Sequence, residues 1–156
     1  MRLHIAAVGR LRQGPERALV DDYLARLDRT GRALGLGPAN EIEVEDRKGG
    51  GMAAEAVLLE RAIPAGSLLC ILDERGRTLA SPEFASQLAS WRDTGRGDVC
   101  FAIGGADGLD PALRQKADFA LSFGQMVWPH MLVRVMLAEQ LYRAASILAN
   151  SPYHRA

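Results

Sequence analysis

The chain has 156 residues, 48% of them hydrophobic, which predicts one globular domain over residues 1–156 and excludes an intrinsically disordered chain. Lys and Arg number 19, and so do Asp and Glu, which gives a formal net charge of zero. That balance argues against a protein that coats nucleic acid by bulk charge, although it is compatible with a local basic patch.

Strands and helices alternate along the first two thirds of the chain. The strands are short apolar or alternating runs, and the helices carry apolar residues at helical spacing. In order, we predict a strand over 2–9, a helix over 14–28, a loop over 30–40, a strand over 41–46, a basic glycine loop over 47–51, a helix over 52–63, a strand over 67–73, a helix over 81–93 and a strand over 98–105. Ser81 is the expected N-cap of its helix, with Pro82 at the first helical position. Nearly continuous apolar strands predict a parallel α/β sheet with helices on both faces.

The pattern changes after residue 105. A short helix beginning at Pro111 is expected within 109–117, and the segment 118–130 holds a short strand and then a loop. The longest helix is expected over 131–150, followed by a polar tail over 151–156.

The two cysteines, Cys70 and Cys100, each lie inside an apolar run and are expected to be buried, reduced thiols in strands. This usage favours a reducing cytosol. The N-terminal apolar run is too short for a signal peptide, and nothing approaches the ~20 apolar residues of a membrane span. The expected location is therefore cytoplasmic, with neither a membrane nor DNA as a partner.

A glycine turn, FAIGGADGLDP over 101–111, follows the strand over 98–105 and contains Gly104, Gly105 and Gly108. It lacks the spacing of a dinucleotide fingerprint and the Lys-Ser/Thr pair of a P-loop, so a phosphate cradle is disfavoured. Two interpretations remain, which are a tight strand exit that needs positive φ and a ligand that needs close approach of the backbone. The apolar loop SFGQMVWPH over 122–130 favours the ligand, because loops of this kind pack onto the core or around an apolar group such as an adenine.

Three segments resemble one protein family. The C-terminal segment LVRVMLAEQLYRAASILANSPYHRA is similar to that of the bacterial 23S rRNA (pseudouridine-N3)-methyltransferases, the H-type large-subunit methyltransferases of the SPOUT superfamily. FAIGGADGL resembles the family's Ile-Gly-Gly-Pro-x-Gly segment, and LLCILDERG resembles its Leu-Asp-x-x-Gly strand end. The resemblance covers essentially the whole chain. The sequence departs from the family at Ala106, Ser151 and Ala156, where proline, histidine and a charged residue are usual.

The resemblance implies an α/β SPOUT fold with a deep trefoil knot, roughly over 98–156. It also implies S-adenosylmethionine as cofactor and a homodimer as the active form. The implied reaction is methyl transfer to N3 of a pseudouridine in a large-subunit rRNA hairpin, with the assembled ribosome as substrate.

The family's cofactor contacts and active-site tail fall on definite residues of this chain. The expected cofactor contacts are Leu72, Gly104, Phe123, Gly124, Gln125, Met126, Val127 and Trp128. The expected catalytic residues are Tyr153, His154 and Arg155. His154 is a candidate base for the N3 proton, with an ordinary pKa of about 6.5. Arg155 can bind phosphate or developing negative charge, and Tyr153 can stack on the base.

The long helix carries two further signals. Glu139 and Arg143 stand one turn apart and are expected to pair. Arg134 lies among apolar residues and needs a partner, which we expect either across a dimer interface or in RNA or cofactor. His130 is expected to cap the helix or line the pocket, and the His and Cys spacing predicts no metal.

Local basic groups are the candidates for RNA contact: Arg10, Arg12, Arg47, Lys48, Arg75 and Arg77. Two competing interpretations stay open. A nucleotide-binding enzyme of another kind would bind NAD or ATP at the glycine turn, and a non-catalytic module would bind ribosomes without transferring a methyl group.

Overall fold

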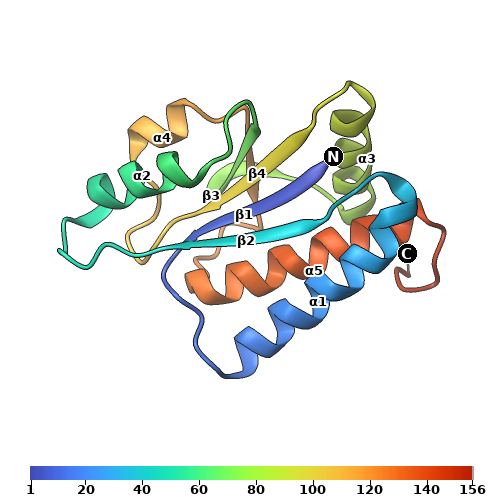
Figure 1. Ribbon diagram of the computed structural model, residues 1–156, viewed down its shortest axis with the longest axis horizontal. Helices are drawn as coiled ribbons and strands as arrows, with labels where there is room; N and C mark the ends of the chain where they lie inside the picture. The colour runs from blue at the N-terminus through green and yellow to red at the C-terminus, as the bar shows by residue number, and fades with distance from the viewer. Residues whose placement is uncertain (156) are drawn as a thin grey trace.

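The computed structural model describes residues 1–155. Helices alternate with five strands along the chain (Figure 1). In order, the elements are β1 (Arg2–Val8), α1 (Pro15–Gly31), the 3₁₀ helix η1 (Arg32–Leu34), β2 (Ala39–Val44), α2 (Gly51–Ala62), β3 (Leu68–Thr78), α3 (Ser81–Asp93), β4 (Asp98–Ile103), α4 (Pro111–Gln115), β5 (Phe119–Ser122) and α5 (His130–Leu148). Residue 156, where the sequence departs from the family pattern, lies outside the described residues.

The five strands form one sheet in the order β2-β1-β4-β3-β5, and every neighbouring pair is parallel. The central strands β1 and β4 are almost entirely buried, as their continuous apolar sequences predict. Cys70 and Cys100 are both buried in strands. The predicted parallel α/β class is therefore confirmed, whereas the trefoil knot stays a prediction.

Helices cover both faces of the sheet (Figure 1). On one face α1, α3 and α5 bury Leu27, Leu88 and Leu141 against alternate strand residues. On the other face α2 and α4 bury Leu59 and Leu113 against the strand residues in between. None of the described helices is both long and apolar enough to cross a membrane.

The expected loop over 30–40 is wrong in its first half, because helical structure continues through η1. Gly31 is the last residue of α1, and a Cβ there would lie 2.4 Å from the carbonyl oxygen of Leu36. Glycine is therefore needed here for close backbone approach, not for a turn. Gly35, with φ +69°, ends the segment in the left-handed conformation.

Ser81 does not cap α3. Ala80 occupies the N-cap position, and Ser81 is the first helical residue. The Ser81 hydroxyl instead donates a hydrogen bond to Oε1 of Gln140 at 2.8 Å, which ties the start of α3 to α5. Tertiary contact has replaced the local capping bond that the sequence suggested.

Candidate functional site: a cavity at the sheet edge and a docked tail

A cavity of about 280 Å³ lies where β4 and β5 end and α5 begins, beside an excursion within β3. In parallel α/β sheets, ligands bind at the carboxyl ends of the strands. The residues that line it are Leu72, Asp73, Glu74, Arg75, Ile103, Gly104, Gly105, Ala106, Asp107, Gly108, Leu109, Leu121, Phe123, Gly124, Met126, Val127, Trp128, His130 and Val133. The list includes every predicted cofactor contact except Gln125, which is exposed on the same loop.

An excursion in β3 supplies one wall of the cavity. Both Leu72 and Arg77 pair with Leu121 of β5, so the four residues between them leave the ladder. Those four are Asp73, Glu74, Arg75 and Gly76, and the first three line the cavity. A Cβ on Gly76 would lie 2.6 Å from the Ala120 backbone, so glycine lets β3 return to β5. The strand predicted over 67–73 thus continues to Thr78, and sequence periodicity did not reveal the excursion.

The glycine turn forms a second wall. Gly105 and Gly108 form a bridge in which the Gly108 amide donates to the Gly105 carbonyl at 3.0 Å. Only Gly108 of the three glycines has positive φ, at +82°. A Cβ on Gly104 would lie 2.6 Å from the Gly108 carbonyl group. Gly104 is therefore required by the turn's own backbone, and the expectation of positive φ holds only for Gly108.

The apolar loop between β5 and α5 forms the third wall. Ser122 holds its start, because the Ser122 hydroxyl accepts from the Gly124 amide at 3.0 Å. Gly124 has φ +110°, a conformation that side chains rarely allow. Met126 and Val127 are 74% and 80% exposed, so the chain alone leaves a strongly apolar loop uncovered.

Asp73 and Arg75 form an ion pair in the cavity lining. The Asp73 carboxylate accepts from the Arg75 amide at 2.9 Å and from Arg75 Nε at 3.0 Å, with Arg114 Nη1 at 3.9 Å. Burial alone would raise the pKa of Asp73, but the hydrogen bonds from Arg75 and the charges of Arg75 and Arg114 lower it overall. Asp73 is therefore ionised near neutral pH and holds Arg75 beside the cavity.

Arg134 finds its partners within the same chain, which corrects the expectation of a partner subunit, RNA or cofactor. Only 1% of its side chain is exposed. Nη1 donates to Glu41 at 2.8 Å and to Glu43 at 2.5 Å, and Nη2 donates to the Gly9 carbonyl at 2.9 Å. Glu43 also accepts from the Leu11 amide at 2.7 Å. The alternating sequence EIEVED contained the signal, because Glu41 and Glu43 fall on one face of a strand.

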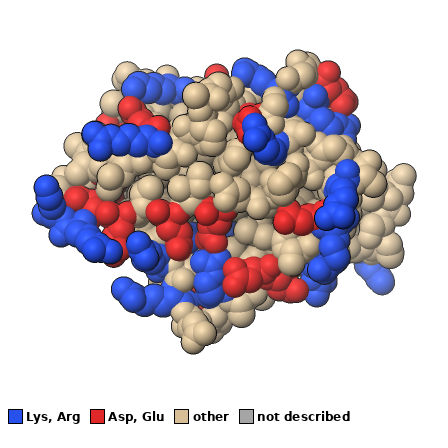
Figure 2. Space-filling view, in the orientation of Figure 1, with Lys and Arg blue, Asp and Glu red and all other residues tan. Residues whose placement is uncertain are grey.

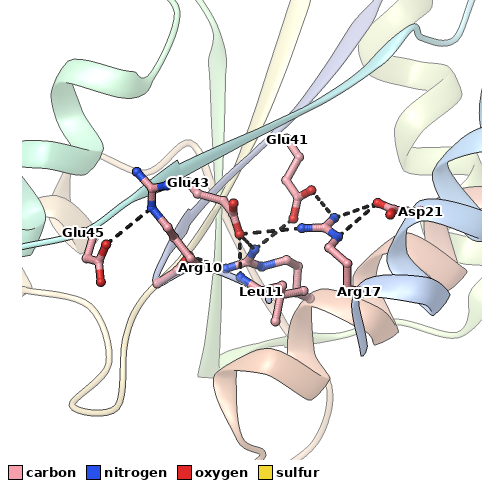
Figure 3. Close-up of polar contacts among 9 residues, drawn as sticks. Arg10, Leu11, Arg17, Asp21, Glu41, Glu43 and Glu45 are labelled. Atoms are coloured by element: carbon pink, nitrogen blue, oxygen red, sulfur yellow. Dashed lines mark hydrogen bonds and ion pairs between the residues drawn. The ribbon is translucent and has the colours of Figure 1, made fainter. Parts of the chain in front are cut away.

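Arg17 of α1 completes this ionic network (Figure 3). It pairs closely with Glu41, and its Nη1 lies 3.7 Å from Glu43. Burial alone would raise the pKa of Glu43, but hydrogen bonds from Leu11 and Arg134, with the charges of Arg134 and Arg17, lower it overall. The network therefore joins α1, β2 and the start of α5 just behind the cavity.

The C-terminal tail is docked on the second half of α5, from Glu139 to Arg143. The predicted pair of Glu139 and Arg143 is confirmed, with Arg143 Nε at 3.0 Å from Glu139 Oε1. The Tyr153 hydroxyl donates to the same Glu139 oxygen at 2.9 Å. Nδ1 of His154 lies 3.2 Å from Arg143 Nη1, and Arg143 stacks over the Tyr153 ring at 4.8 Å. Arg155 is exposed.

One chain does not bring the predicted cofactor residues and the predicted catalytic tail together. His130 and Val133 of α5 line the cavity, whereas the tail contacts Glu139 and Arg143, six to thirteen residues away on the same helix. At a rise of about 1.5 Å per residue this is about 9–20 Å along α5. The tail does not line the cavity.

Several of the basic residues proposed for RNA contact are paired on the surface. Arg10 and Arg47 lie 3.4 Å and 3.9 Å from Glu45, and Arg77 stacks over Phe119 at 5.3 Å. Figure 2 shows Lys and Arg side chains interleaved with Asp and Glu side chains on one face. Exposed ion pairs of this kind are weak, so their Lys and Arg side chains can exchange a carboxylate partner for a phosphate group.

Comparison with known proteins places the chain among methyltransferases. The family model described as a predicted SPOUT methyltransferase matches residues 1–154. A relative from Ruegeria pomeroyi named ribosomal RNA large subunit methyltransferase H is 71% identical over 155 residues, 99% of each chain. A relative of the same name from Cereibacter sphaeroides is 74% identical over the same share of each chain.

Solved structures share the fold at low sequence identity. A probable methylase family protein from Haemophilus influenzae has a TM-score of 0.54 at 14% identity, covering 99% of this chain and 70% of that one. A probable methyltransferase from Bordetella pertussis has a TM-score of 0.50 at 17% identity, covering 92% and 96%. These likenesses support the architecture alone.

Proposed function

The chain belongs to the SPOUT methyltransferase family, among the large-subunit rRNA methyltransferases H, and we propose that it transfers a methyl group from S-adenosylmethionine to N3 of a pseudouridine in 23S rRNA. The observation that carries this proposal is convergence on one cavity. Seven of the eight residues that match the family's cofactor contacts line the same 280 Å³ space, although they come from three separate segments.

The residues around the cavity suit S-adenosylmethionine. Leu72, Phe123 and Trp128 offer apolar surface to the faces of an adenine, and the backbone of the glycine turn can read its edge. The carboxylates of Asp73 and Glu74 suit the hydroxyl or cationic groups of the rest of the molecule. When bound, this cofactor supplies a methyl group on a positively charged sulfur.

The tail residues Tyr153, His154 and Arg155 are proposed to act on the target base. Methylation at N3 requires loss of the imide proton, which a neutral His154 can accept. Arg155, exposed on the tail, can bind a phosphate or the negative charge that develops on the base. Tyr153 can stack on the base after it leaves Glu139.

A homodimer is proposed as the active form, with the tail of one copy beside the cavity of the other. Two observations support this arrangement. The tail contacts Glu139 and Arg143, about 9–20 Å along α5 from the residues of that helix that line the cavity of its own chain, and it does not reach the cavity. Five large apolar side chains beside the cavity are exposed, as is typical of a protein interface. They are Met126, Val127, Trp128, Met131 and Leu132.

The proposed substrate is the assembled ribosome in the cytoplasm. A chain with no net charge and interleaved surface charges binds RNA weakly through bulk electrostatics. Recognition is therefore proposed to depend on a preformed shape, which an rRNA hairpin and its neighbours present together on the assembled ribosome.

The test is transfer of labelled methyl from S-adenosylmethionine to ribosomes that lack the modification, with free 23S rRNA in parallel. We expect label on N3 of a pseudouridine with ribosomes only. Label on another position would overturn the assigned target. Binding of ribosomes without any transfer would favour the non-catalytic module, and binding of NAD or ATP in place of S-adenosylmethionine would favour the other nucleotide-binding enzyme.

A further inference from the structure

His130 is the one titratable ring that lines the cavity, yet the proposed function gives it no role. It is the first residue of α5, and its ring lies beside Gly9, where a Cβ would come within 3.5 Å of Cε1. Its Nδ1 atom is buried and has no hydrogen-bond partner among residues 1–155. Nε2 is therefore the ring nitrogen that can reach a molecule in the cavity.

Arg134 stands one helical turn after His130, and its charge adds to the effect of burial on the pKa of that ring. Burial and the positive charge of Arg134 both lower the pKa of His130, so the imidazole is neutral at neutral pH. The Nε group of Arg134 is also buried without a partner in the described part of the chain. Because the buried Nδ1 has no acceptor for a proton among the described residues, we expect the single ring proton on Nε2.

The ionic network fixes Arg134 in turn. Glu41, Glu43 and the Gly9 carbonyl occupy both terminal nitrogens of its guanidinium group, so the group cannot rotate toward another partner. Gly9 also packs against the His130 ring. A chain of contacts thus runs from the carboxylates of β2 to Arg134, from Arg134 to Gly9, and from Gly9 to the His130 ring in the cavity.

We propose that Nε2 of His130 donates a hydrogen bond to an oxygen of bound S-adenosylmethionine, and that Arg134, held by Glu41, Glu43 and the Gly9 carbonyl, is the positioning residue that fixes the orientation and tautomer of this ring. The inference rests on the proposed function, because it takes S-adenosylmethionine as the occupant of the cavity. A neutral donor suits this ligand, since a charged imidazolium would repel the positively charged sulfur. The acceptor belongs either to the ribose or to the carboxylate of the amino-acid part.

Calorimetric binding of two ligands to the intact protein tests the contact. We expect His130→Ala to weaken S-adenosylmethionine binding about five- to tenfold, as for loss of one hydrogen bond. His130→Gln, whose amide nitrogen can reach the position of Nε2, should recover most of the affinity, and His130→Asn should not. The ligand 5′-methylthioadenosine keeps the ribose and lacks the carboxylate. If His130→Ala loses as much affinity for this ligand as for S-adenosylmethionine, the acceptor is on the ribose. If it loses none, the acceptor is the carboxylate.

A matched pair of variants tests the positioning role. Glu43→Gln weakens the hold on Arg134, whereas Glu45→Gln removes a carboxylate two residues later that pairs only with exposed Arg10 and Arg47. Nitrogen-15 spectra of the histidine rings report which nitrogen of His130 carries the proton. We expect Nε2 to carry it in the wild type and in Glu45→Gln. In Glu43→Gln we expect a mixed or shifted signal and about a threefold loss of cofactor affinity.

The outcomes separate this inference from the function on which it rests. Wild-type affinity in His130→Ala, or a wild-type ring proton on Nδ1, would overturn the inference and leave the methyltransferase intact. A wild-type protein that does not bind S-adenosylmethionine would overturn the proposed function and the ligand contact together. The ring spectra would then still decide whether Arg134 fixes the tautomer.

Discussion

At the scale of single residues, the most consequential side chain is Arg134. It is the largest fully buried side chain of the described residues, and two carboxylates and a carbonyl compensate its charge. A buried ion pair contributes little net stability when intact, because desolvation offsets attraction. Removal of Arg134 leaves two carboxylates with Arg17 as their one remaining cation among the described residues, and that is strongly unfavourable.

The first prediction concerns this asymmetry. Arg134→Met should lower the free energy of unfolding by about 3–5 kcal/mol, because Glu41 and Glu43 lose their buried partner. The control is Arg47→Met, since Arg47 is exposed and lies 3.9 Å from Glu45, and its loss should cost at most about 1 kcal/mol. Unfolding in denaturant measures the free energy of unfolding of both variants and of the wild type. Equal effects of the two variants would show that the network does not constrain the fold.

Sequence reasoning identified the need of Arg134 for a partner but not the partner. A charge in an apolar helix demands compensation whatever the fold, so the requirement is local. The partner depends on which strand lies beside α5, and this is a property of the sheet order. His130 was predicted to cap the helix or line the pocket because it follows Pro129 at the start of the long helix, and it does line the cavity.

At the scale of elements, sequence patterns located each α-helix and strand, but they missed η1, the second half of β3 and other features set by close backbone contact. The continuation of α1 into η1 depends on the Leu36 carbonyl that packs on Gly31. The β3 excursion depends on how Gly76 meets Ala120 in β5, which lies more than forty residues away in sequence. Both features need knowledge of a distant neighbour, which a sequence pattern does not contain.

The docking of the tail on α5 predicts how the stability of the protein and the titration of Tyr153 depend on pH. Burial raises the pKa of Tyr153, and the hydrogen bond and charge of Glu139 raise it further. The stability from this contact is therefore present below pH about 10, the ordinary tyrosine value, and is lost as the pH rises through the higher folded value. In Glu139→Gln the tyrosinate absorbance should appear at lower pH than in the wild type.

The matched control for that titration is Glu60→Gln, which removes a carboxylate paired with Lys116 far from the tail. Its tyrosinate curve should overlay that of the wild type. Superimposable curves for Glu139→Gln and the wild type would mean that Tyr153 does not rest on Glu139 in solution.

At the scale of the whole molecule, the chain separates the two groups of residues that the proposed reaction uses. The proposed cofactor residues were located by resemblance, and all but Gln125 converge on the cavity. The cavity wall at residues 73–75 was missed, because it depends on the β3 excursion. The tail was located by the same resemblance, but its distance from the cavity only appears once the fold is known.

Mixed dimers test most directly whether one copy completes the site of the other. Gly104→Val should disable the cavity, because a Cβ there meets the Gly108 backbone at 2.6 Å, and His154→Ala should disable the tail. Each variant alone should transfer little methyl to ribosomes. After the two are unfolded and refolded together in equal amounts, we predict recovery of about a quarter of wild-type transfer, since half the dimers are mixed and each has one intact site. No recovery, with mixed dimers present, would contradict a site shared between two copies.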